Sequence, residues 1–277
     1  MRCCSNVLQE PKVFNMELHV STSGFQVITL DDNETQFNLH VDKHLNVKLA
    51  IPYGGIEALR TSCIELEEGA SLTILMKNVK QQKNMLNQQA VLHKDAILTI
   101  AYWEIEDGAS QIRLDVQLME SGAQVMVRSA CIAKEQKDFY VKCHHEVAHT
   151  KSQMEHYAIV EDEGNYRMEA IGKIVKGAHA SESHQTTRVL TLSDHHNSEV
   201  VPVLYIDEND VKASHATTLG QPDENQLYYL QSRGLSRSQA LGLLTVGYLM
   251  PISDLFDDAT YHDEMKNEIE KRVGLHA

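Results

Sequence analysis

The side chain best placed for chemistry in this sequence is the imidazole of His215. It stands between Ser214 and Ala216 and is followed by Thr217 and Thr218. This run of small residues predicts an accessible loop. Neutral imidazole is a good ligand for iron, and histidine can replace cysteine on iron–sulfur clusters. From these residues alone, a capping or packing histidine just before a helix is the commoner alternative.

Two other groups of histidines are poorer candidates for a metal site. In the run HHEVAH, His145 and His149 would share one face of a strand. At the rise of a strand they would lie about 13 Å apart, too far for one ion. We therefore expect His144, His145 and His149 to be partly exposed strand residues. The adjacent pair His195 and His196 is expected to lie in a loop.

The cysteines indicate reduced thiols, because they are odd in number and irregularly spaced. They are Cys3, Cys4, Cys63, Cys131 and Cys143. Cys3 and Cys4 could suggest a metal site, but adjacent side chains seldom reach one ion. A disordered or frayed N-terminus over residues 1–12 is the preferred interpretation. The other three thiols fall in β segments and are expected to be buried and inert.

Composition excludes several classes of function. The chain has 277 residues and a formal net charge of −14, which argues against nucleic acid and anionic membranes as partners. It contains no apolar run of signal-peptide or membrane-spanning length, so a cytoplasmic location is expected. The patterns of P-loop nucleotide hydrolases, serine hydrolases and zinc proteases do not occur either. These observations favour a protein that is not an enzyme.

A turn signal recurs along the body of the chain. Its tips are Gly69, Asp95, Gly108, Gly122, Gly164 and Gly177. The steps between them are 26, 13, 14, 42 and 13 residues, close to whole multiples of 13 or 14. Glycine or aspartate at a tip supplies the positive φ that a tight corner needs.

The segments between the tips alternate between apolar and polar residues. Ile112, Leu114, Val116 and Leu118 are apolar, and the residues between them are polar, which predicts strands with one buried face. Two corners in each coil would give about 27 residues per turn of a β-solenoid. An antiparallel sandwich with evenly spaced turns remains the alternative.

A helical segment is predicted after the β body. We assign residues 13–221 to the β body and residues 222–277 to a small C-terminal α-helical domain. Asp223 is a good helix start, and Gly234 is placed to end the first helix.

Two more helices are expected in this C-terminal domain. Ser236 and Gln239 form a capping-box pattern at the start of the second helix, and Pro251 closes it. The third is predicted over 257–273.

The chain from the middle of the β region to near its end resembles the SufB/SufD family of iron–sulfur cluster assembly proteins, and SufD in particular, most strongly from Val201 to Tyr248. The resemblance rests on the order of several short motifs in EVVPVLYIDENDVKASHATTLGQPDENQLYYLQSRG. These are a Pro-aliphatic strand, an acid pair before Val-Lys, a Ser-His loop, and then Tyr-Leu and Ser-Arg-Gly. The family resemblance implies a right-handed parallel β-helix followed by C-terminal helices.

The resemblance also implies partners and roles. A SufD-like scaffold would pair with a SufB-like protein through the β-helix and bind a SufC-like ABC ATPase through its C-terminal helices. His215 matches a loop histidine implicated in cluster assembly, so it is the candidate metal residue. Tyr229, Arg233 and Gly234 fall in the segment associated with ATPase docking. No cofactor is expected to be stably bound, although a transient iron–sulfur cluster could form at the interface with the SufB-like partner.

The sequence also departs from the family pattern. Ala213 stands where SufD proteins often have cysteine, and Ile206 replaces the cysteine of SufB-type proteins. The chain is therefore not expected to be the sulfur-accepting subunit. It resembles a short form without the family's N-terminal helical domain. Two alternatives remain, a cytosolic β-helix carbohydrate-active enzyme and a self-pairing homologue without cluster function, and the isolated chain could form a homodimer.

Overall fold

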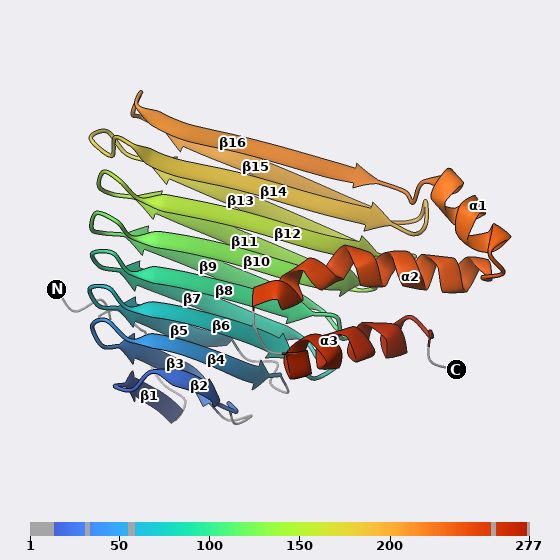
Figure 1. Ribbon diagram of the computed structural model, residues 1–277, viewed down its shortest axis with the longest axis horizontal. Helices are drawn as coiled ribbons and strands as arrows, with labels where there is room; N and C mark the ends of the chain where they lie inside the picture. The colour runs from blue at the N-terminus through green and yellow to red at the C-terminus, as the bar shows by residue number, and fades with distance from the viewer. Residues whose placement is uncertain (1–13, 31–33, 55–58, 256–258, 276–277) are drawn as a thin grey trace.

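The structure is a computed structural model. It describes residues 14–30, 34–54, 59–255 and 259–275. The predictions for residues 1–12, including those for Cys3 and Cys4, lie outside these ranges. In the described part, the strands form a parallel β-solenoid made of two eight-stranded sheets, followed by helices (Figure 1).

Odd-numbered strands form one sheet and even-numbered strands form the other. The odd sheet contains β1 (Phe14–Val20), β3 (Glu34–Val41), β5 (Leu59–Leu66), β7 (Asn84–Leu92), β9 (Ser110–Leu118), β11 (Gln136–His145), β13 (Asn165–Ile174) and β15 (Asn197–Ile206). The even sheet contains β2 (Gly24–Val27), β4 (Asn46–Tyr53), β6 (Ser71–Asn78), β8 (Ile97–Glu104), β10 (Gln124–Ala133), β12 (Lys151–Val160), β14 (Ser181–Thr191) and β16 (Val211–Gly220).

The register of the strands gives the length of each coil. Gln124 on β10 pairs with Lys151 on β12, an offset of 27 residues, which agrees with the predicted repeat. Ser181 on β14 pairs with Val211 on β16, so the offset grows to 30 residues at the C-terminal end. Every strand pair is parallel and joins strands two apart in sequence. The β-solenoid is therefore confirmed, and the antiparallel sandwich is wrong.

Five of the six predicted corner tips have positive φ. They are Gly69, Asp95, Gly108, Gly122 and Gly177. At the sixth corner the positive φ belongs to Glu163, at 59°, and not to Gly164. Gly164 is needed for a different reason, since a Cβ there would lie 2.1 Å from the carbonyl oxygen of Ala133.

The core lies between the two sheets and is built from stacked rows of inward-facing side chains. One row runs through Ile74, Ile100, Val127 and Met154, all fully buried. Because a single coil cannot close its own core, each of these rows must be continued by the next coil.

The C-terminal segment begins as predicted. It contains α1 (Glu224–Ser232), α2 (Arg237–Leu249), a short 3₁₀ helix η1 (Met250–Leu255) and α3 (Ala259–Arg272). The Asp223 side chain accepts from the backbone N–H of Asn225, and Ser236 with Gln239 forms the expected capping box. Pro251 lies within η1, just after α2 ends. Part of the predicted third helix, including Asp257, lies outside the described residues. No helix in the described ranges is long and apolar enough to cross a membrane.

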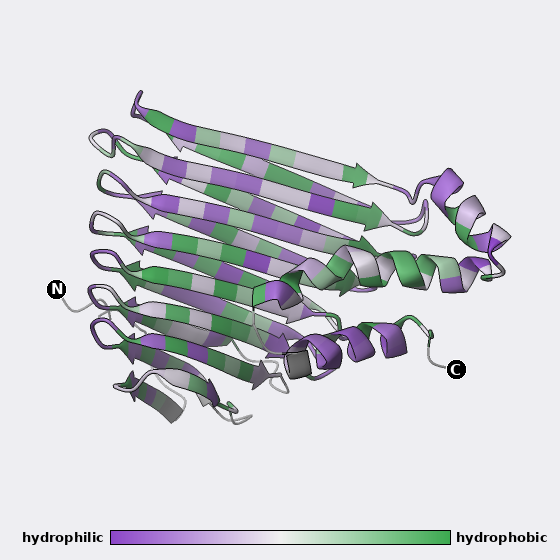
Figure 2. Ribbon diagram, viewed as in Figure 1, coloured by the Kyte–Doolittle hydropathy of each residue, from purple (hydrophilic) through white to green (hydrophobic). Residues whose placement is uncertain are grey.

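Helices α2 and α3 fold back over the outer face of the even sheet (Figure 1). Trp103 and Ile159 on the sheet pack in one apolar cluster with Leu249 and Ile269 of the helices. The Trp103 indole N–H also donates to Glu268 at 3.0 Å. Mainly hydrophilic residues make up α3 (Figure 2), yet Met265 and Ile269 on this helix are buried and face this cluster.

Candidate functional site

The last coil of the solenoid, formed by β15 and β16, is an open end. Each of these strands pairs with one neighbour in the described part of the chain, whereas the strands of the middle coils pair with two. The inward-facing positions of β14 are buried, but the matching positions of β16 are half-buried or exposed. Unpaired backbone groups along an edge strand are a template for pairing with another chain.

His215 lies in the middle of β16, so the prediction that it belongs to a loop is wrong. Its partner in the register is Gln185 on β14, which is buried in the core. Residues paired in a parallel sheet share a face, so the His215 side chain lies on the inner side of the sheet. It is exposed because no further coil of the described residues covers it. The small residues around it are compatible with a strand, and pairing with β14 places this segment in the sheet and not in a loop.

Gln185 gives this open end an unpaired polar atom. Its side-chain N–H donates to the carbonyl oxygen of Val203 on β15 at 2.9 Å, so the amide bridges the two sheets. The side-chain Oε1 is buried without a hydrogen-bond partner among the described residues. Such an acceptor costs free energy until a donor reaches it. It lies in the same row as His215 and one strand deeper.

Below the open end the core becomes polar. His145 contacts the hydroxyls of Thr150 and Ser152 at 2.8 Å each, and Ser152 donates to Ser183 at 2.9 Å. Burial, reinforced by the neighbouring imidazole of His144, lowers the pKa of His145 to about 4. His145 is therefore a neutral interior residue at one end of a row of hydrogen-bonded hydroxyls, those of Thr150, Ser152 and Ser183.

The structure corrects the prediction for the HHEVAH run. His145 is fully buried and His144 is largely buried, so neither is a partly exposed strand histidine. His149 lies at the corner after β11 with a φ of 61°, and its ring contacts that of His179. The rise of the strand and the turn separate these side chains, so they do not form one metal site. His195 lies at an exposed corner, as expected.

The thiols of the described strands do not reach the open end. Cys131 and Cys143 are fully buried in the core, and burial raises the pKa of both thiols. Cys63 is half-buried on the outer face of β5, so the expectation of a buried thiol is wrong there. Ala213 and Ile206 occupy inward positions on the last coil but bring no sulfur.

The residues expected to contact an ATPase gather at the C-terminal end of α1. Tyr229 is exposed, and the Arg233 guanidinium lies over its ring at 5.2 Å from the centroid. Gly234 has a φ of 97°, and its N–H donates to the Gln231 carbonyl at 2.9 Å to end the helix. In Figure 1, α1 projects beyond the end of β16.

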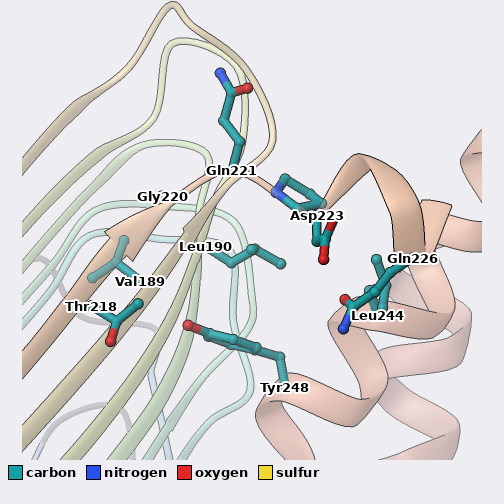
Figure 3. Close-up of a pocket in the computed structure, with 10 residues that line it drawn as sticks. Val189, Leu190, Thr218, Gly220, Gln221, Asp223, Gln226, Leu244 and Tyr248 are labelled. Carbon is teal, nitrogen blue, oxygen red and sulfur yellow. The ribbon is translucent and has the colours of Figure 1, made fainter.

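A pocket of about 220 Å³ separates α1 and α2 from the last strands. Figure 3 shows the Tyr248 ring extending from the helices towards the strands, below Leu190. Leu244 lines the helical side, Gly220 is the last residue of β16, and Asp223 is the N-cap of α1. The helical segment is therefore joined to the last coil by an incompletely filled contact.

Comparison with known proteins identifies the family. The family model described as "SUF system FeS cluster assembly, SufBD core domain" matches residues 33–248. This chain belongs to the SufBD family.

Three relatives illustrate how far the similarity to SufBD proteins extends. The chain is 35% identical to the SufD protein of Bacillus subtilis over 117 residues, which are 42% of this chain and 27% of that protein. It is 25% identical to Escherichia coli SufD over 130 residues, 47% of this chain and 30% of that protein. "Protein ABCI7, chloroplastic" of Arabidopsis thaliana is 21% identical over 210 residues, 71% of this chain and 44% of that protein. The alignments thus span less than half of each relative.

The predicted SufD-like resemblance is confirmed by these matches. The SufBD core match covers the solenoid from before β3 to near the end of α2. It therefore includes His215 and the α1 residues. Sequence reasoning missed Gln185, whose only signal was its position one coil before His215.

Proposed function

We propose that this SufBD-family chain is a SufD-like scaffold subunit of iron–sulfur cluster assembly and that its last coil pairs with a SufB-like protein. The open end of the solenoid is the observation that supports this pairing. Its strands β15 and β16 have an unpaired edge, and Ile206 and Leu219 are exposed apolar residues there. A second solenoid with a similar edge could continue both sheets and bury these side chains.

In this proposal His215 acts at a cluster that is cargo and is not stably bound. The last coil offers one imidazole and no thiolate, because residues 197–220 contain His215 as their one histidine and no cysteine. A [2Fe–2S] or [4Fe–4S] cluster needs about four ligands, so the SufB-like partner would supply the remaining ones. His215 would then complete a transient site at the interface.

The proposal assigns ATPase docking to α1. The stacked pair of Tyr229 and Arg233, held by the helix end at Gly234, projects from the body where a SufC-like ATPase could reach it. The pocket beside Tyr248 would allow α1 to shift relative to the last coil when the ATPase changes shape. The chain itself would be a cytoplasmic scaffold without enzymatic activity, with hydrolysis in the partner.

The first experiment mixes the chain with its organism's SufB-like and SufC-like proteins under anaerobic conditions. Size-exclusion chromatography with light scattering should show one complex containing all three. Ile206→Lys should prevent pairing with the SufB-like protein, because it buries a charge at the interface. Ile97→Lys is the matched control, since Ile97 is 40% exposed and Ile206 is 39% exposed, but Ile97 lies on a middle coil.

Two further variants separate the roles of the last coil and α1. His215→Ala should leave the three-protein complex intact but abolish transfer of a reconstituted cluster to an apo acceptor. Arg233→Ala should release the ATPase, whereas Met119→Ala, an exposed apolar residue at a distant corner, should not. A chain that always elutes alone or as a homodimer would contradict the proposal and favour the self-pairing homologue.

A further inference from the structure

A second group of metal-ligating side chains lies far from the last coil, at the corner that follows strands β3, β5 and β7. These corners belong to the row at the left of Figure 1. His40 on β3 is the direct register partner of Glu65 on β5. The backbone ladder continues past the strands, with the N–H of His93 donating to Leu66 at 3.0 Å. Residues one coil apart are therefore stacked side by side on the outer surface.

The ligand atoms of this corner already converge. His93 Nε2 lies 3.1 Å from Glu65 Oε1, and His40 Nδ1 lies 3.5 Å from Glu65 Oε2. His40 Nε2 is 3.7 Å from Glu67 Oε1. One ligand atom each from Glu65, Glu67 and His93 lies within 4.8 Å of the others. An ion bound tetrahedrally at about 2.0–2.1 Å requires ligand atoms about 3.3 Å apart, so small rotations would suffice.

A second observation also points to a metal. The other ring nitrogen of His93, Nδ1, lies 3.1 Å from Glu120 Oε1. Histidines that bind metals usually donate their second N–H to a carboxylate, which fixes the tautomer and the ring orientation. Glu120 also accepts from the backbone N–H of Lys94 at 3.2 Å, so its own position is held.

The charges of the corner favour a cation. Three carboxylates, those of Glu65, Glu67 and Glu120, lie around the imidazoles of His40 and His93. The nearest lysines, Lys43 and Lys94, pair with Glu68 and not with these carboxylates.

We propose that this corner binds one divalent transition-metal ion through His93, Glu65 and Glu67, with the fourth position open to water. An imidazole beside two carboxylates suits Zn²⁺ or Fe²⁺ better than Mg²⁺ or Ca²⁺, which prefer oxygen ligands. The two carboxylates also neutralise the charge of the ion. The side chains of Glu65, Glu67 and His93 are 45%, 31% and 28% exposed, so an ion can enter without unfolding the solenoid. This site is independent of the proposed role of His215.

The test is a titration of the untagged full chain with Co²⁺ and then Zn²⁺ at pH 7.5 after removal of metals. Co²⁺ is the spectroscopic probe, because its visible absorption reports four-coordinate binding. We expect one equivalent to bind and Zn²⁺ to displace it. His93→Ala should weaken the affinity at least 100-fold, and Glu65→Gln at least tenfold. Glu120→Gln should weaken it 10- to 100-fold although Glu120 is not a ligand.

Control variants make the result decisive. His195→Ala removes an exposed histidine from another corner and should leave the affinity unchanged. His19→Ala tests the neighbouring group of His19, His40 and Asp42, and it should also leave the affinity unchanged. Thermal unfolding of each variant without metal separates a loss of affinity from a loss of the fold. Binding weaker than about 1 mM, or binding that persists in His93→Ala, would overturn the proposal.

Discussion

The middle coils and the last coil of the solenoid have the same pattern of strands, but their inward-facing side chains lie in opposite environments. Val127 and Met154, on β10 and β12, are fully buried in one inward-facing row. The same row continues through Gln185 to His215, which is exposed. The row thus changes from apolar to polar as it approaches the open end. Each coil covers the one before it, so the last coil must either be capped or serve as an interface.

The outer face of the even sheet shows the same contrast. Over the middle coils, α2 and α3 cover Trp103, Ile132 and Ile159. Towards the last coil this cover gives way to the pocket beside Tyr248. The repeat therefore sets the stacking of the coils, whereas the burial of a side chain depends on what lies beyond its face of the sheet.

The largest effect should come from the buried ion pair of the middle coils. Lys137 and Glu104 are both fully buried, with Nζ and Oε2 3.4 Å apart, and Lys137 also donates to the backbone carbonyl of Glu106 and the hydroxyl of Ser110. Lys137→Met should lower the free energy of unfolding by about 3–5 kcal/mol, because it leaves Glu104 buried without a countercharge. Urea denaturation measures the change.

A double variant checks the reason. Adding Glu104→Gln to Lys137→Met should recover a large part of the loss, since no uncompensated charge remains. If the double variant were as unstable as the single one, packing and not charge would explain the effect.

The helical cover should give the next largest effect. Ile269 on α3 is fully buried against the even sheet. Ile269→Ala should cost about 3 kcal/mol, within the usual range for a buried large-to-small change. Lys266→Ala on the same helix removes an exposed i,i+4 pair with Glu270 and should change stability by less than about 0.5 kcal/mol. Equal effects from the two variants would show that α3 does not dock on the sheet as described.

The buried histidine of β12, His156, should make the free energy of unfolding depend on pH. His156 contacts Ser129 at 2.8 Å, and burial lowers its pKa to about 3, against about 6.5 when unfolded. As pH falls below 6.5, the unfolded chain binds a proton that the folded chain does not, so stability is lost. At pH 5 this histidine should cost about 2 kcal/mol relative to pH 8.

The variant His156→Gln isolates this contribution. Urea midpoints measured from pH 8 to pH 5 should fall less steeply in the variant than in the original chain. Parallel pH profiles for the two proteins would contradict the assignment.

The smallest effect on stability should come from the last coil. His215 and Leu219 occupy inward positions but are exposed. Replacing either with alanine should change the free energy of unfolding of the isolated chain by less than about 0.5 kcal/mol. A loss above about 1 kcal/mol that grows with protein concentration would show that the isolated chain already buries this coil in a homodimer.

Much of the fold follows from local signals in the sequence. The alternation in residues 110–118, five of the six corner tips and the caps at Asp223 and Ser236 agree with the structure. These features depend on neighbouring residues, so one stretch of sequence is enough to specify them. The candidate site was less predictable, because His215 lies on a strand and His145 lies in the core. Their environments depend on the strand one coil away.

Two other groups of residues also depend on contacts that a single stretch of sequence does not show. They are the strand residues under α2 and α3, and the corner residues His40, Glu65 and His93. The apolar runs around Trp103 and Ile132 are typical of strands buried on both faces, but they do not say what covers the outer face. His40, Glu65 and His93 lie about one coil apart in the sequence, and only the register brings their side chains together.

Residue types and short spacings are enough to specify the repeat, the corners, the start of the helical segment and the family resemblance. The tertiary structure decided which side chains meet and which stay exposed. The physical reason is the stacking of coils, since a contact between residues about 27 positions apart exists only when the register of two strands aligns them. It also decided where the stacking stops, and this leaves His215 at an open edge.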